Sequence, residues 1–299
     1  METVFPKLQI LDAWRSWSVR YHKPLLALAM AIFVAGSIWS IRSLELPAQQ
    51  LNGMALAMLV CMSPLSLVYS GVGLQLMAKT AGTRISFGKS VVTSALAILA
   101  EALPIPGGAI VRTGALMKAG VGLGEGAGLV LLTAVLWIML GALGAGLAIL
   151  GSAKAAGWVL VAVGLVGTLG SAGWLWRQAG AKLALLLLVH RLSGIVLIAV
   201  RLYLAFLVLG LTIPVVQTLP FVLALIAGSA AAIAPAGLGI SEALAALAAT
   251  AVAVPPAAAF LAVGLDRVVN LLASGAIALV PLMKVRTAPM HPDRGGSDA

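Results

Sequence analysis

Residues 233–244 read I-A-P-A-G-L-G-I-S-E-A-L, and they place a proline, two glycines and a carboxylate inside one of the most apolar parts of the chain. The residues before them read F-V-L-A-L-I-A-G-S-A-A-A, and those after them read A-A-L-A-A-T-A-V-A-V. Proline interrupts helical hydrogen bonding, and glycine allows backbone shapes that other residues resist. The stretch therefore predicts a break in an apolar helix, with Glu242 beside it.

The composition around this break is that of a membrane protein. The 299 residues are 62% apolar and 9% charged, whereas soluble domains are about 25% charged. Apolar runs long enough for a transmembrane helix recur, and they lack the alternation of barrel strands. The net charge of +10 then indicates basic loops beside an anionic leaflet rather than nucleic-acid binding. We predict an all-α polytopic protein of the bacterial cytoplasmic (inner) membrane.

The apolar runs predict six full spans and two interrupted stretches. Each interrupted stretch has a Pro/Gly break near its middle, and its halves are too short to cross a bilayer that needs about 20 helical residues. Non-helical backbone is tolerated at membrane depth where protein covers it, so we expect two re-entrant helical hairpins, at 86–120 and 218–250. The full spans are expected near residues 24–41, 53–78, 127–151, 155–176, 193–213 and 257–283.

Basic residues give this arrangement an orientation. If both interrupted stretches are re-entrant, Lys and Arg gather overwhelmingly on one side, which is the cytoplasmic side. Residues 1–23 are then a cytoplasmic interfacial segment, 24–285 a flippase-like transmembrane domain and 286–299 a cytoplasmic tail. Residues 181–191 are expected to lie along the inner interface; the alternative is a crossing over 182–200 that buries His190 and Arg191.

The two breaks resemble each other, which predicts an internal repeat. The first reads P-G-G-A-I-V-R-T-G-A-L from Pro106, and the second reads P-A-G-L-G-I-S-E-A-L-A from Pro235. One span, 155–176, separates the halves, so the second half is inverted relative to the first. Inverted repeats whose broken helices meet near the midplane form a transporter architecture.

The breaks also predict a binding site. A half-helix that starts at a break presents free N–H groups and a positive dipole end, which suits a lipid phosphate. We expect Glu242 to pair with Arg267 and Glu101 with Arg112, either for function or only for structure, because ionisable groups in spans need partners or a cavity. Arg201 lies in a span or snorkels from its end. The candidate substrate-binding residues are Gly107, Gly108, Arg112, Arg201, Gly237, Gly239, Glu242 and Arg267.

A buried carboxylate can also carry a proton, since burial favours its neutral form. The candidates are Glu101, Glu242 and Asp266. Asp266 and Arg267 are adjacent and cannot share one helix face, so at least one must find a partner elsewhere. The single cysteine, Cys61, excludes an internal disulfide and a cysteine cluster for metal. We predict no metal and no cofactor.

The second break carries a family resemblance. The pattern P-x-G-L-G-x-x-E, at Pro235, Gly237, Leu238, Gly239 and Glu242, resembles the signature of the flippase-like integral membrane family. This family includes the transmembrane domain of lysylphosphatidylglycerol synthase, the multiple peptide resistance factor. Arg267 and the P-G-G-x-x-x-R pattern that ends at Arg112 also fit, and the resemblance extends over about residues 25–285.

The resemblance implies a membrane domain that binds or moves lipids. No soluble aminoacylating domain follows residue 285, so no enzyme is expected. The position before Glu242, often basic in relatives, is Ser241 here, and head-group specificity does not carry over. The leading hypothesis is a lipid translocase that binds an anionic, phosphate-containing membrane lipid between the hairpins. The alternatives are an ion-coupled transporter of a small solute and, last, an intramembrane lipid-modifying enzyme.

Overall fold

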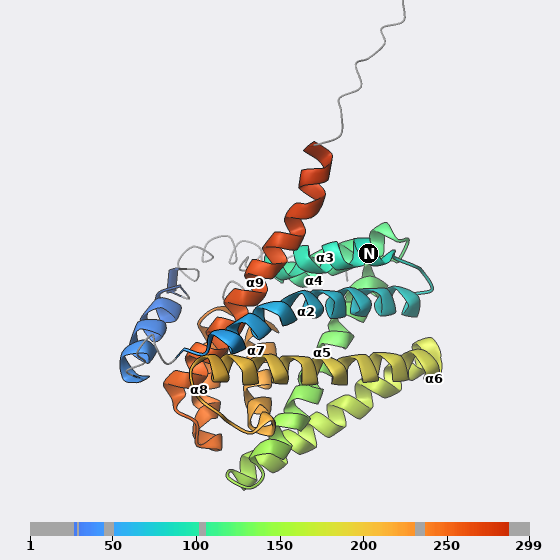
Figure 1. Ribbon diagram of the computed structural model, residues 1–299. Coiled ribbons are helices and arrows are strands. Elements are labelled where there is room, and N and C mark those ends of the chain that lie inside the picture. Colours follow the sequence, from blue (N-terminus) through green and yellow to red (C-terminus); the bar gives the residue numbers. More distant parts are fainter. Residues whose placement is uncertain (1–26, 29, 45–50, 102–105, 231–236, 287–299) are drawn as a thin grey trace, which may run out of the picture.

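The structure is a computed structural model that describes residues 27–28, 30–44, 51–101, 106–230 and 237–286. Across these residues the chain forms helices joined by short turns, with no strand (Figure 1). The predicted all-α class is confirmed. The expected interfacial segment 1–23, the tail from 287 and Pro235 lie outside the described residues.

Long apolar helices make up most of the structure. Four helices of the described part are long and apolar enough to cross a membrane: α2 (Gly53–Thr80), α5 (Leu123–Ile149), α6 (Lys154–Val208) and α9 (Pro256–Arg286), the last over Pro256–Leu279. A shorter apolar helix, Met30–Leu44, lies within the range of the first predicted span and its loop. These helices indicate an integral membrane protein.

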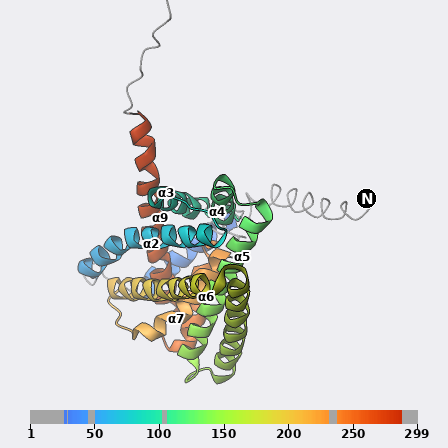
Figure 2. The same cartoon turned by 90° about the vertical axis from the view of Figure 1, so that its right-hand side faces the viewer.

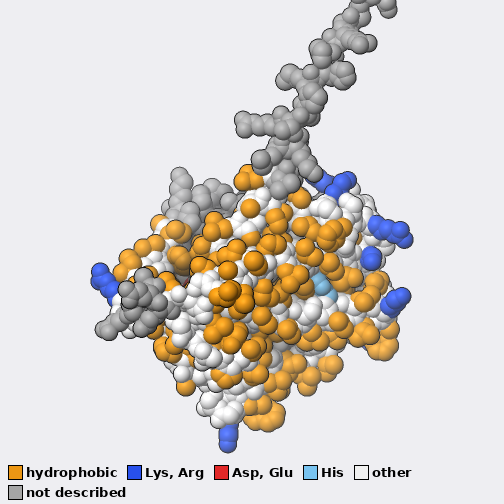
Figure 3. All heavy atoms as spheres, in the orientation of Figure 1, with side chains coloured by type: hydrophobic (Ala, Val, Ile, Leu, Met, Phe, Trp, Pro, Cys, Tyr) orange, Lys and Arg blue, Asp and Glu red, His pale blue; other side chains and the backbone are white. Residues whose placement is uncertain are grey.

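The surface agrees with this class. Hydrophobic side chains cover most of the face in Figure 3, and Lys and Arg side chains lie mainly at its edges. Large apolar side chains project from the long helices, with Val166 71% exposed and Leu272 70% exposed. A soluble monomer rarely exposes so large a continuous apolar surface, whereas lipid tails would cover it.

Helix α6 is two arms rather than one straight rod. Gly180 has φ 80° and ψ 164°, so the chain turns there between residues 154–179 and 181–208. The second arm runs unbroken to Val208, and His190 and Arg191 are buried in it. The expected interfacial segment at 181–191 is therefore not a separate element, because it continues without a break into the helix that ends at Val208. The burial of His190 and Arg191 agrees with the alternative, in which residues 182–200 cross the membrane.

The first arm of α6 packs closely against α5, and glycines allow the close approach (Figure 2). A Cβ built on Gly146 would lie 2.7 Å from the backbone nitrogen of Val161, and one on Gly164 would collide with the backbone of Leu143. Small residues let membrane helices approach backbone to backbone, where dispersion and weak polar contacts replace the hydrophobic effect. This pair forms one wall of the molecule.

Two pairs of short helices stand where the sequence predicts hairpins. The first pair is α3 (Phe87–Ala100) and α4 (Gly107–Lys118). The second is α7 (Leu219–Ala230) and α8 (Ile240–Ala249), flanked by the 3-10 turns η2 (Val215–Thr218) and η4 (Thr250–Val252). The members of each pair pack against each other. At 1.5 Å per residue the four helices are about 15 to 21 Å long, less than the roughly 30 Å of a hydrocarbon core.

The hairpins make equivalent contacts in the two halves of the chain. Helix α3 packs on α9 and α7 packs on α5, so the first arm of each hairpin contacts a long helix of the other half. Helix α4 packs on α5 and α8 packs on α9, so each second arm contacts the helix that follows it. The two halves are thereby interlocked through their hairpins.

The packing of α5 on α6 yields a first prediction. Gly164→Ala should destabilise the protein by about 1–3 kcal/mol, because the added methyl group enters occupied backbone space. Thermal unfolding of the protein purified in detergent would measure the change.

Gly170→Ala is the matched control on the same arm, since a Cβ there meets nothing within 4 Å. It should leave stability unchanged or raise it by up to about 1 kcal/mol, because alanine is the better helix former. Equal effects of the two substitutions would contradict the close packing.

Candidate functional site

After the second hairpin break, the start of α8 is capped by a carboxylate from its own first turn. Gly239 begins α8 with φ 80°, and its backbone N–H donates to Glu242 Oε2 at 2.7 Å. The Glu242 side chain is completely buried. A carboxylate at this position satisfies a free N–H group and complements the positive end of the helix. Glu242 therefore occupies the helix start at which the sequence predicts an anionic ligand.

Arg267 of α9 holds this carboxylate and the hairpin together. Its Nη1 lies 3.5 Å from Glu242 Oε1, and its Nη2 donates to Ser241 Oγ at 2.7 Å and Ser229 Oγ at 3.0 Å. The predicted pairing of Glu242 with Arg267 is confirmed. Since Ser229 ends α7 and Ser241 begins α8, one guanidinium joins both arms of the hairpin to α9.

Glycines bring the two arms of this hairpin into backbone contact. Gly237 has φ 65°, and a Cβ on it would collide with the carbonyl of Gly228. A Cβ on Gly228 would collide with the Ser241 hydroxyl. The sequence analysis singled out Gly237 but missed Gly228, whose only signal is a small residue in the preceding helix.

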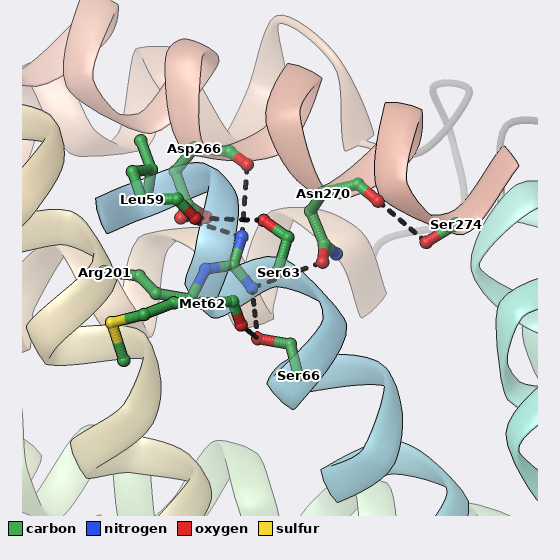
Figure 4. A network of polar contacts seen from close by, with 8 residues as sticks. All are labelled: Leu59, Met62, Ser63, Ser66, Arg201, Asp266, Asn270 and Ser274. Atoms are coloured by element: carbon green, nitrogen blue, oxygen red, sulfur yellow. Dashed lines mark hydrogen bonds and ion pairs between the residues drawn. The ribbon is translucent and has the colours of Figure 1, made fainter. Parts of the chain in front are cut away.

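Arg201 lies in a separate, closed network (Figure 4). It is 3% exposed, and its Nη2 lies 2.8 Å from Asp266 Oδ1 of α9. Its Nη1 donates to Ser66 Oγ of α2 at 2.6 Å and to Asn270 Oδ1 at 3.2 Å, and its Nη2 also donates to the Asp266 carbonyl at 3.2 Å. Snorkelling of Arg201 is therefore wrong, because its side chain is buried and both Nη atoms contact α2 or α9. Adjacent Asp266 and Arg267 indeed serve different partners.

The first hairpin break holds the more open ion pair. Arg112 Nη2 of α4 lies 3.2 Å from Glu101 Oε1 at the end of α3, and these side chains are 25% and 29% exposed. This pairing was also predicted. A Cβ on Gly108 would lie 2.5 Å from Glu101 Oε1, and one on Gly107 would collide with the carbonyl of Ala100. The carboxylate thus lies against the start of α4, as Glu242 does at α8.

A fourth arginine, Arg191, has no carboxylate partner among the described residues. It was not among the candidate site residues predicted from the sequence. Its guanidinium carbon lies 5.1 Å from the centre of the Trp137 ring. Beside it, the rings of Tyr69 and His190 stack at 4.1 Å. A cation–π contact is worth roughly 2 kcal/mol when desolvated, whereas burying an unpaired ion costs several. Among the described residues, Arg191 is the buried arginine that has no carboxylate within ion-pair distance.

Polar atoms of this cluster also lack partners. Tyr69 Oη, Trp137 Nε1, His190 Nε2 and Arg191 Nε are buried and accept or donate no hydrogen bond. Gly73 and Gly194 make room for the rings, because a Cβ on either would enter the space of His190 or Tyr69. Among the described residues, no group of three or more His, Cys, Asp and Glu side chains is placed to hold a metal.

Compared with known proteins, the chain matches no protein-family model and no curated protein. The likeness to the flippase-like family thus stays a prediction from short motifs. The geometry groups the predicted site residues into three sets: Glu101 and Arg112 with Gly107 and Gly108, Glu242 and Arg267 with Gly237 and Gly239, and Arg201 with Asp266.

The closed network around Arg201 yields a second prediction. Arg201→Met should cost about 3–5 kcal/mol of unfolding free energy, because it leaves the Asp266 carboxylate buried without its cation. The double variant Arg201→Met/Asp266→Asn should recover most of that loss, since neither charge remains. A double-mutant cycle of unfolding free energies in detergent measures the coupling.

Arg177→Met is the control, because Arg177 lies exposed on the same helix; it should change stability by less than about 0.5 kcal/mol. Additive effects of the two network substitutions would show that Arg201 and Asp266 do not stabilise each other.

Proposed function

We propose that this protein is a lipid translocase that binds an anionic, phosphate-containing lipid head group at the first hairpin break and carries it across the membrane. One observation carries the proposal: two short-helix hairpins, each with an arginine–carboxylate pair at the start of its returning helix, inside a protein of long apolar helices. Broken helices of this kind supply ion sites in transporters.

The first break suits an exchangeable ligand. Arg112 offers a guanidinium that binds phosphate in two-point fashion, and α4 adds the free N–H groups of its first turn. Glu101 now occupies that position as an internal anion, yet the pair is only partly buried. A phosphate can therefore displace the Glu101 carboxylate from Arg112 without exposing a dry core. Glu101, once released, is the candidate proton carrier.

The second break suits a fixed support. Glu242 is fully buried, caps α8 and pairs with Arg267, whose Nη2 donates to two serines. Displacing this carboxylate would leave a buried guanidinium and a buried helix end unsatisfied at once. In this proposal Glu242 and Arg267 hold the second hairpin in shape, while head-group exchange takes place at Arg112.

The proposal includes an inverted repeat with both hairpins re-entrant. One arm of α6, residues 154–179, lies between the halves, and a single crossing inverts the second half. The first hairpin then opens to the cytoplasm and the second to the outside, with both chain termini cytoplasmic. The equivalent contacts of α3 with α9 and α7 with α5 support this arrangement.

Surface labelling tests the topology. With exposed Cys61 replaced by serine, Ser86→Cys and Gly122→Cys should react from the cytoplasmic side, because they flank the first hairpin. Val216→Cys and Pro255→Cys flank the second and should react from the outside. A membrane-impermeant maleimide applied to intact cells and to inverted vesicles distinguishes the sides. Labelling of Ser86→Cys and Gly122→Cys from opposite sides would overturn the first hairpin's re-entrant course.

Reconstitution tests the activity. Fluorescent phosphatidylglycerol should leave the outer leaflet of proteoliposomes faster than that of protein-free vesicles. The fraction that remains in the outer leaflet is the fraction that an added quencher reaches. Arg112→Gln should lower that rate at least about tenfold, because it removes the charge-assisted contacts to the phosphate.

Lys118→Gln is the matched control on α4, since Lys118 is exposed at the far end of the same helix; its rate should stay within about twofold of the unsubstituted protein. Wild-type protein that accelerates no anionic phospholipid would refute the translocase proposal. An unaltered rate for Arg112→Gln would refute the site.

A further inference from the structure

Arg191 stands apart from the other arginines of the helical interior. Arg201 and Arg267 each have a carboxylate partner, and so does Arg112. The carboxylates of Glu101, Asp266 and Glu242 are therefore already paired. The fourth acidic residue of the described chain, Glu125, is exposed on α5. Arg191 is 9% exposed and has no carboxylate within ion-pair distance in the described part of the chain.

Each of the polar groups around Arg191 can donate a hydrogen bond to an anion. Indole and guanidinium nitrogens only donate, and the Tyr69 hydroxyl and a neutral histidine can donate as well. These atoms come from three helices, since Tyr69 is in α2, Trp137 in α5, and His190 and Arg191 in α6. Trp137 lies over one face of the guanidinium, so a phosphate would bind at the edges of the guanidinium, where two N–H groups can point at two oxygens.

The surroundings favour an anion on electrostatic grounds also. Arg191 brings a positive charge into the cluster of Tyr69, Trp137 and His190. Nothing among the described acidic side chains neutralises it at Arg191.

We propose that Tyr69, Trp137, His190 and Arg191 form a binding site for a phosphate group, which supplies the anion that Arg191 lacks. The phosphate belongs to a lipid head group or to a free phosphate ion, and both present the same oxygens. Any part that this site plays in transport rests on the proposed translocase function. Phosphate binding at this site does not depend on the translocase function and is measured without transport. The binding site and the translocase function can therefore be refuted independently.

Ligand-dependent stability of the full-length protein tests the site. Unfolding in a neutral detergent is followed by far-UV circular dichroism while sodium phosphate replaces sodium chloride at constant ionic strength. A second series adds phosphatidylglycerol, with phosphatidylcholine as the zwitterionic control. A ligand that binds only the folded state raises the unfolding temperature, so phosphate, phosphatidylglycerol or both should raise it. The series that responds identifies a free ion or a lipid-borne group.

Variants connect the response to the cluster. Arg191→Met should weaken phosphate or phosphatidylglycerol binding at least about tenfold, because the charge-assisted contacts are lost. Without anion it should unfold at the wild-type temperature or above, since the unpaired charge is gone; a merely structural arginine would lower that temperature. Tyr69→Phe and Trp137→Phe keep the rings, remove one donor each and should weaken binding by about three- to tenfold. Tyr69→Phe and Trp137→Phe test the site if Arg191→Met does not fold.

The control is Arg177→Met, which removes an exposed arginine of the same helix and should keep the full anion response. The proposal is overturned if neither phosphate nor phosphatidylglycerol raises the unfolding temperature. It is equally overturned if Arg191→Met, or both aromatic variants, respond with wild-type affinity.

Discussion

The interior of this protein depends on the compensation of charges that α9 brings into an apolar environment. Asp266 and Arg267 are consecutive, and successive residues of a helix point about 100° apart. Asp266 therefore meets Arg201 and through it α2 and α6, while Arg267 meets Glu242 and both arms of the second hairpin. Two adjacent side chains thus fix α9 against opposite parts of the fold.

A second constraint comes from the helix breaks. Each hairpin starts a helix after its break, and the first N–H groups of that helix have no partners within the helix itself. At α8 the chain solves this with Glu242, which accepts from the Gly239 N–H. At α4 it places Glu101 against Gly108, with Arg112 as the cation. Glycines are needed at both breaks because the carboxylate and the opposite backbone fill the space of a side chain.

Each of the two breaks has an arginine–carboxylate pair, but the two pairs differ in exposure. This difference decides which pair can exchange its carboxylate for a ligand. A fully buried pair such as Glu242 and Arg267 resists exchange, since each charge would lose its partner in a low dielectric. A pair that is partly exposed, such as Glu101 and Arg112, can trade its internal anion for an external one. Arg191 follows the same principle, because it is buried without a carboxylate partner and, in our proposal, an anionic ligand supplies the negative charge.

Much of the fold could be predicted from local patterns. Apolar runs longer than a bilayer is thick marked the long helices, and Pro and Gly in the middle of shorter runs marked the breaks at Gly107 and Gly239, because these features act through the backbone of a few neighbouring residues. The pairs Glu101–Arg112 and Glu242–Arg267 were also predicted, since a charge in an apolar run needs an opposite charge nearby.

Other features were decided only by the tertiary structure. The chain turns at Gly180 and buries His190 and Arg191, although their charge and position near a basic loop favoured an interfacial segment. Arg201 finds Asp266 across 65 residues, and Tyr69, Trp137 and Arg191 meet from three helices. The physical reason is that composition determines which segments enter the apolar phase, whereas the partner of each buried charge depends on which helix faces pack together.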